Sequence, residues 1–104
     1  LMKSIKNNLG SVQHLDILTE HEKKVFKTAY EINQMALLRL AAARQPKICQ
    51  GQSLNLFFAA DEKEEWIVKV HRAAFRNPNI KQIYYMRTMA GVTASSGECV
   101  ACEG

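Results

Sequence analysis

Three features are missing from this 104-residue sequence: a long apolar run, a cluster of basic residues and an export signal. No apolar stretch approaches the roughly 20 residues that a membrane helix needs, so no membrane partner is expected. The 14 basic residues exceed the 10 acidic ones by only four and are spread along the chain, which argues against a nucleic-acid partner. There are only three cysteines, and Leu1–Ser4 does not open a signal peptide. We therefore expect a reducing compartment, the cytoplasm of a cell or of a virus-infected host.

The first third of the chain is predicted to hold a short segment, a turn and then a helix. A short segment, Leu1–Asn8, ends at a turn at Gly10 and Ser11. Thr19 and Glu22 have the spacing of a capping box, in which each side chain bonds the backbone N–H of the other residue. Apolar residues repeat on one face after this box, which predicts a helix that runs through Tyr30.

A second helix is predicted over Ile32–Arg44. It is apolar nearly all round and is therefore expected to be buried on several sides, and Pro46 stops it.

A strand–helix–strand unit is predicted next. Ser53–Phe58 and Ile80–Arg87 are typical of strands. The helix between them begins at a second capping-box pattern, Asp61–Glu64, and places apolar residues on one face. Strands joined by a crossover helix are expected to be parallel neighbours.

Two parallel strands do not make a stable sheet by themselves. A chain this short is at most one domain and is marginal alone. We therefore expect an α/β fold in which two leading helices and a βαβ unit complete a larger sheet that belongs to another chain.

The C-terminal end carries a pair of cysteines, Cys99 and Cys102, in a stretch of small and polar residues whose composition predicts disorder. A thiol pair at this spacing can close to a disulfide and be reopened by exchange. The same spacing is also half of a zinc site, but zinc requires four ligands. The other candidate ligands, Cys49, His14, His21 and His71, have no matching spacing.

Four further blocks of the sequence are informative together with the terminal cysteine pair: Gly10–Asp16, Val25–Ala29, Gln50–Leu56 and Ile83–Thr88. Taken in this order, they resemble the C-terminal part of the catalytic (α, large) subunit of class I ribonucleotide reductase. The resemblance covers essentially the whole chain. It implies that residues 1–87 complete the ten-stranded α/β barrel of that subunit and that residues 88–104 form a flexible, redox-active tail.

The resemblance also implies roles for four residues. Tyr84 and Tyr85 would pass an oxidising equivalent from a separate small subunit to the thiyl cysteine, with Tyr84 nearer that cysteine. Cys99 and Cys102 would reduce the active-site disulfide after each turnover. The implied activity is that of a ribonucleoside-diphosphate reductase, which this chain supports only within a complex.

The implied partners are the N-terminal segment of the catalytic subunit, the radical-generating small subunit, thioredoxin or glutaredoxin, and a ribonucleotide substrate in the assembled enzyme. No cofactor is expected on this chain, because the small subunit, expected to contain metal, supplies the radical. We expect the catalytic subunit to be split, with this chain as its C-terminal piece.

Adjacent residues of a regular strand point to opposite faces, so two tyrosines that exchange an electron need a strand that bends or ends beside them. The alternative is an ordinary pair of strand aromatics. Cys49 is expected to be a buried structural thiol, and His71 a packed or surface histidine. Gln52, Ser53 and Asn55 would either support the barrel mouth or satisfy backbone groups.

Asn77 replaces the glycine that usually closes the preceding helix in the family, and asparagine can adopt the left-handed conformation at that position.

The alternative function is non-catalytic. In that case the chain would be a small α/β interaction module or redox adaptor whose CxxC tail binds metal or a partner.

Overall fold

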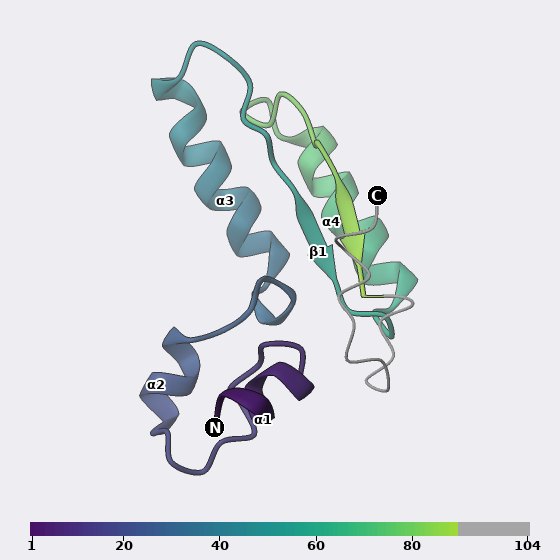
Figure 1. Ribbon diagram of the computed structural model, residues 1–104. Coiled ribbons are helices and arrows are strands. Elements are labelled where there is room, and N and C mark those ends of the chain that lie inside the picture. The colour runs from purple at the N-terminus through teal and green to yellow at the C-terminus, as the bar shows by residue number, and fades with distance from the viewer. Residues whose placement is uncertain (90–104) are drawn as a thin grey trace, which may run out of the picture. The chain divides into compact units, whose positions relative to one another are not determined.

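The computed structural model describes residues 1–89, which form two compact units, residues 1–29 and residues 30–89. Within these residues no helix is long and apolar enough to cross a membrane. The elements, in chain order, are α1 (Met2–Asn7), α2 (Glu20–Val25), the 3₁₀ helix η1 (Ala29–Glu31), α3 (Gln34–Arg44), the 3₁₀ helix η2 (Gln45–Lys47), β1 (Leu56–Phe58), α4 (Glu64–Arg76) and β2 (Met86–Thr88) (Figure 1).

The first unit consists of two short helices joined by an irregular segment. The predicted turn follows α1, where Leu9 and Gly10 have φ angles of 55° and 86°. Glycine adopts such angles readily, whereas a leucine does so at a cost. The His14 ring makes hydrogen bonds to α1 and to the residue after it: Nε2 lies 2.8 Å from Ser4 Oγ, and Nδ1 lies 2.9 Å from Asn8 Nδ2.

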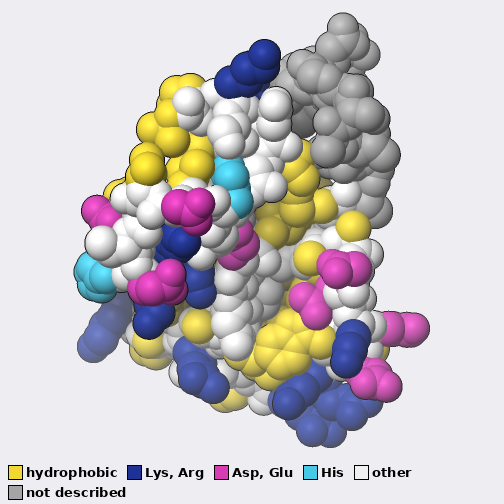
Figure 2. Space-filling view, turned by 90° about the horizontal axis from the view of Figure 1, so that it is seen from below, with side chains coloured by type: hydrophobic (Ala, Val, Ile, Leu, Met, Phe, Trp, Pro, Cys, Tyr) yellow, Lys and Arg dark blue, Asp and Glu magenta, His cyan; other side chains and the backbone are white. Residues whose placement is uncertain are grey.

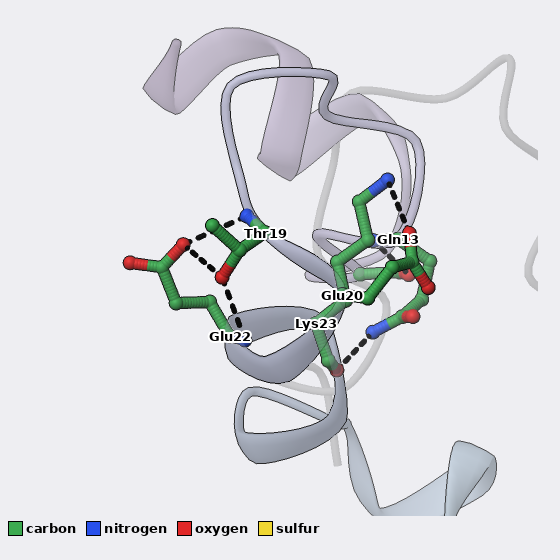
Figure 3. Close-up of polar contacts among 6 residues, drawn as sticks. Gln13, Thr19, Glu20, Glu22 and Lys23 are labelled. Carbon is green, nitrogen blue, oxygen red and sulfur yellow. Dashed lines mark hydrogen bonds and ion pairs between the residues drawn. The ribbon is translucent and has the colours of Figure 1, made fainter.

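The predicted capping box of α2 is confirmed (Figure 3). The backbone N–H of Thr19 donates to Glu22 Oε2 at 2.8 Å, and the backbone N–H of Glu22 donates to Thr19 Oγ1 at 3.3 Å. Because the Thr19 backbone N–H and hydroxyl both donate to this carboxylate, the pKa of Glu22 lies below its ordinary value. Gln13 Nε2 also donates to the Lys23 carbonyl at 2.7 Å, which ties the segment before α2 to the helix.

The prediction that this helix continues through Tyr30 is wrong, since α2 ends at Val25. Val25 and Phe26 are 61% and 59% exposed. An isolated helix is extended mainly by packing of its apolar face, and these two side chains lack such packing. The chain re-enters helical geometry only in the short η1.

Helix α3 begins two residues later than predicted, where Asn33 Oδ1 accepts a hydrogen bond from the Met35 N–H at 2.9 Å. It ends at Arg44, before Pro46, as predicted. The expectation of burial on several sides is wrong: the buried residues are Gln34, Leu38 and Ala41, which form one stripe. Apolar composition alone did not show that only one side of α3 finds a packing partner.

The second unit has an apolar core between α3, α4 and the strand pair. Its fully buried residues are Leu38, Ala41, Leu54, Leu56, Phe58, Val70 and Ala74. The prediction of parallel, neighbouring strands is confirmed, with Leu56 opposite Met86 and Phe58 opposite Thr88. In Figure 1 the two strands run side by side, and α4 connects the end of one to the start of the other.

Helix α4 has the predicted buried face, which includes Val70 and Ala74. The capping box predicted at Asp61–Glu64 is wrong, because the helix starts at Glu64 and its N-cap, Lys63, makes no side-chain cap bond. Asn77 at the C-cap has φ −89° and ψ 115°, so it is extended and not left-handed. The chain instead turns just after α4, where the Ile80 N–H donates to the Asn77 carbonyl at 3.0 Å.

Both strands are shorter than predicted. The sequence suggests strands over Ser53–Phe58 and Ile80–Arg87, but regular pairing covers only Leu56–Phe58 and Met86–Thr88. The side chains of β1 are buried or half-buried, whereas all three of β2 are exposed. The structure therefore presents one strand inside the unit and one strand at its surface.

Candidate functional site

The two predicted radical-transfer tyrosines lie immediately before β2. The centroids of the Tyr84 and Tyr85 rings are 4.2 Å apart, and the ring planes meet at 59°. Regular pairing starts only at Met86, so the alternation of strand side chains does not separate these two rings. The expectation that the rings approach each other where the strand ends is confirmed.

Hydrogen bonds to Leu54, before β1, and to Leu56, the first residue of β1, hold the backbone of the tyrosine pair. The Tyr84 N–H donates to the Leu54 carbonyl at 2.7 Å, and the Tyr85 carbonyl accepts from the Leu56 N–H at 2.8 Å. Leu54 and Leu56 are buried in the core. The tyrosine backbone is therefore tied to the core, while the two side chains remain 57% and 50% exposed.

Arg87 is a further member of the site that the sequence analysis missed. Its guanidinium carbon lies 5.2 Å from the centroid of the Tyr85 ring, which is the geometry of a cation–π contact. Arg87 follows Tyr85 by two residues in the sequence, but no motif marks a contact at that spacing. The contact restrains the Tyr85 ring from the side of β2.

Polar residues of the loop before β1 have divided roles. Gln52 satisfies a backbone group, since its Nε2 donates to the Ala41 carbonyl at 2.8 Å. Ser53 is exposed. Asn55 Oδ1 is buried and has no hydrogen-bond partner among the described residues. Asn55 follows Leu54 directly, so this acceptor lies beside the backbone that holds Tyr84.

The cysteines fall into two groups. Cys99 and Cys102 lie outside the described residues. The expectation that Cys49 is buried is wrong, because Cys49 is exposed. It lies in the loop after η2, where Ile48, Gln50 and Gly51 are exposed as well, so no element of the unit covers it.

His71 is packed, as expected. Its ring stacks on Phe58 with centroids 6.0 Å apart, and its Nδ1 lies 2.8 Å from the Ile67 carbonyl. Since a carbonyl only accepts, Nδ1 carries the proton in this contact. Within residues 1–89 no group of three potential metal ligands occurs.

The chain belongs to the ribonucleotide reductase barrel-domain family. The family model described as "Ribonucleotide reductase, barrel domain" matches residues 1–86. This match confirms the resemblance found in the sequence, and it includes the helices, both leucines that hold the tyrosine backbone, and the tyrosines themselves.

Two similar viral proteins support the same assignment. The chain is 43% identical over 112 residues to the "Putative ribonucleoside-diphosphate reductase large subunit" of Frog virus 3 (isolate Goorha), with 97% of this chain and 20% of that protein covered. It is also 43% identical to the "Ribonucleoside-diphosphate reductase large subunit" of Invertebrate iridescent virus 3, covering 97% of this chain and 18% of the relative. The chain thus spans about a fifth of the length of these curated relatives.

A solved structure has the same fold. The Actinobacillus ureae class Id ribonucleotide reductase alpha subunit aligns with a TM-score of 0.79 at 40% sequence identity. The alignment covers 86% of this chain and 17% of that subunit. The two-unit segment described above is therefore a recurring part of a larger reductase subunit.

Proposed function

We propose that this chain is the segment of a class I ribonucleotide reductase catalytic subunit that carries radical transfer through Tyr84 and Tyr85. The observation that supports this role most directly is the 4.2 Å separation of the two ring centroids. Rings in near contact make each electron-transfer step short. An ordinary strand would have placed two adjacent aromatic side chains on opposite faces.

The chemistry requires each tyrosine to lose an electron and its phenolic proton together and so form a neutral radical. Tyr85 would be oxidised first, by the radical that the small subunit supplies, and would then recover a hydrogen equivalent from Tyr84. The Tyr84 radical would in turn take a hydrogen atom from a cysteine thiol of the remaining catalytic segment, which restores the phenol and leaves a thiyl radical on that cysteine. Both rings are about half-exposed in this chain, so partner segments have access to them.

The same proposal assigns Cys99 and Cys102 to the shuttle dithiol. The thiolate of one cysteine attacks the active-site disulfide and forms a mixed disulfide, and the second cysteine then displaces the active-site sulfur. Two electrons pass to the active site, and the new disulfide on this chain is reduced by thioredoxin or glutaredoxin. Replacing both cysteines with serine should stop turnover after the first cycle, whereas Cys49→Ser should leave it unchanged. Sustained turnover without Cys99 and Cys102 would refute this part.

The remaining segment of the catalytic subunit is the principal partner in this proposal. β1 and β2 would be two of the ten strands of its barrel. Two parallel strands need neighbours to form a stable sheet, and β2 is exposed at all three positions. Apolar side chains also reach the surface between charged ones (Figure 2). Among the large apolar residues, Phe75 on α4 is 79% exposed. Covering such surface favours assembly with the rest of the subunit.

The test is Tyr84→Phe in the assembled reductase, with this chain, the remaining catalytic segment and the small subunit present. The substitution keeps the ring and removes only the phenolic O–H. Assembly should be intact, and deoxyribonucleotide formation should be abolished. The matched control is Tyr30→Phe, because Tyr30 packs edge-on against Phe57 within the same unit and has no role in transfer. Substantial turnover by Tyr84→Phe would refute the proposed function.

A further inference from the structure

The tyrosine pair lies on irregular backbone, so its position depends on what that backbone is attached to. From Asn77 to Tyr85 the chain has no regular helix or strand. Its backbone hydrogen bonds to other described segments run to Leu54, in the loop before β1, and to Leu56, the first residue of β1. The position of the rings therefore depends on β1 and on the path of the loop that precedes it.

That loop is fixed to the end of α3 by three side chains, Arg44, Gln45 and Gln52, which we call the loop anchor. Gln52 Nε2 donates to the Ala41 carbonyl at 2.8 Å and to Gln45 Oε1 at 3.1 Å. Its Oε1 accepts from Arg44 Nε at 3.1 Å. The Gln52 carboxamide thus uses both of its ends, and every partner belongs to the last turn of α3 or to Gln45.

Gln45 continues the anchor along the loop. It is 4% exposed, and its Nε2 donates to the carbonyls of Ile48 at 3.2 Å and Gln50 at 2.8 Å. Buried polar groups of this kind specify one conformation, because leaving any of them unpaired destabilises the fold. The anchor therefore fixes the loop from residue 48 to residue 52.

The anchored loop in turn holds the approach to the tyrosines. Lys81 Nζ donates to the Cys49 carbonyl at 3.0 Å, and Gln82 Nε2 donates to the Gln52 carbonyl at 3.2 Å. Gly51 lies against the same side chain: a Cβ there would be 3.2 Å from Gln82 Cδ. Residues 81 and 82 are thereby tied to residues 49–52. Gln82 precedes Tyr84 by two positions.

We propose that Gln52, supported by Arg44, is a positioning residue for the tyrosine pair. It fixes the loop before β1 to α3 and so sets the separation of the Tyr84 and Tyr85 rings. The inference rests on the proposed radical-transfer function. A displacement of reacting groups by about 1 Å can lower a rate by about 100-fold, so loosening the anchor should slow transfer even when the protein stays folded.

The experiment is single-turnover kinetics in the assembled reductase, with all catalytic thiols reduced beforehand and substrate saturating. Gln52→Leu keeps the approximate size of the side chain and removes all three of its hydrogen bonds. The expected result is a rate constant about tenfold lower, with the amplitude and the substrate KM close to those of the unaltered enzyme. Arg44→Met, which removes one of the three bonds, should give a smaller decrease.

Gln50→Leu is the matched control, because Gln50 is exposed, lies in the same loop and takes part in the anchor only through its carbonyl. It should leave the rate constant unchanged. A merely structural role for Gln52 would lower the amplitude, which counts folded and competent enzyme, and not the rate constant. Loss confined to the amplitude, or an unchanged rate constant, would overturn the inference.

Two arrangements keep the result decisive. If Gln52→Leu does not assemble, Arg44→Met is compared with Gln50→Leu, and equal rate constants for these two overturn the inference. Tyr84→Phe is measured in parallel. Turnover by Tyr84→Phe would refute the proposed function itself, whereas an inactive Tyr84→Phe with an unaffected Gln52→Leu would refute only the positioning role.

Discussion

The two units, residues 1–29 and residues 30–89, differ in the kind of contact that stabilises each of them internally. The first unit has no buried residue, and its two helices have six residues each and are fixed by polar contacts such as the capping box of α2. The second unit encloses seven fully buried apolar residues between α3, α4 and β1. Burial of apolar area is the dominant stabilising term in folding. The second unit therefore supports the tyrosine site, and the first depends more on its local hydrogen bonds.

The same contrast recurs between the two strands. β1 contributes Leu56 and Phe58 to the core, whereas Met86, opposite Leu56, is 51% exposed. The tyrosines precede the exposed strand, but their backbone is bonded to residues next to the buried one. The site thus combines a rigid attachment with side chains that are open to partners.

The largest expected effect is on the buried side of this comparison. Phe58→Ala removes a 1% exposed ring from the centre of the core and should lower the free energy of unfolding by about 3–5 kcal/mol. Met86→Ala, on the exposed strand, should cost less than about 1 kcal/mol. Urea denaturation of the purified chain measures both. Equal losses for the two variants would contradict the division between a buried and an exposed strand.

A smaller effect is expected at a polar group inside the core. Gln34 is 2% exposed, and its Oε1 accepts from the Phe57 N–H at 3.0 Å. Gln34→Leu leaves that N–H of β1 without this acceptor and should cost about 1–3 kcal/mol by the same denaturation measurement. The exposed Gln50→Leu provides the control and should change stability by no more than about 0.5 kcal/mol. A neutral Gln34→Leu would show that α3 is not held to β1 through this bond.

Arg87 tests the exposed strand directly. A cation–π contact at an exposed site is worth about 0.5–1 kcal/mol, so Arg87→Met should lower the single-turnover rate of the assembled enzyme about two- to fivefold. Arg87→Lys keeps the cation and should retain most of the rate. Lys69→Met removes a comparable contact on α4, where Lys69 Nζ lies 5.7 Å from the centroid of the Trp66 ring. This substitution should have no effect on the rate. If Arg87→Lys is as slow as Arg87→Met, the positive charge does not account for the effect on the rate, and the shape of the arginine side chain does.

The order and type of α2, α3, β1, α4 and β2 could be predicted from the sequence, since periodicity and residues such as Pro46 act locally. Helix α1 and the 3₁₀ helices η1 and η2 were not predicted. The lengths could not. The stretch Ile80–Arg87 has strand composition throughout, but pairing begins only at Met86, because pairing depends on the neighbouring segment. Cysteine is a residue type that is usually buried, but Cys49 lies in a stretch, residues 48–51, that is exposed in the described part of the chain. Arg87 was missed because no motif marks a contact between residues two apart.

The two capping-box patterns show the same limit at a single helix end. Thr19 and Glu22 form the box because the helix begins immediately after Thr19. The pattern at Asp61–Glu64 forms no box, because α4 begins at Glu64 itself. A local motif predicts a helix terminus well only when the surrounding packing lets the helix start there. The tyrosine roles came from the resemblance to the family, and the structure added the ring contact and the loop that holds it.

The smallest expected effect concerns the first unit, and it depends on pH. The pKa of Glu22 is lowered in the folded chain by hydrogen bonds from the Thr19 backbone N–H and hydroxyl, relative to an ordinary value of 4.5. A carboxyl group with a lowered folded pKa contributes stability above its unfolded pKa, and that contribution is lost as the pH falls through the folded pKa. Amide hydrogen exchange in α2 should therefore become faster, relative to α4, as the pH drops below about 4.5. In Glu22→Gln, amide exchange in α2 relative to α4 should be equally fast above and below pH 4.5. Glu20→Gln, which lies outside the capping box, should keep the dependence on pH. If the α2 amides of the unaltered chain show no extra loss of protection in acid, the capping box does not stabilise the first unit, and some other contact must hold α2.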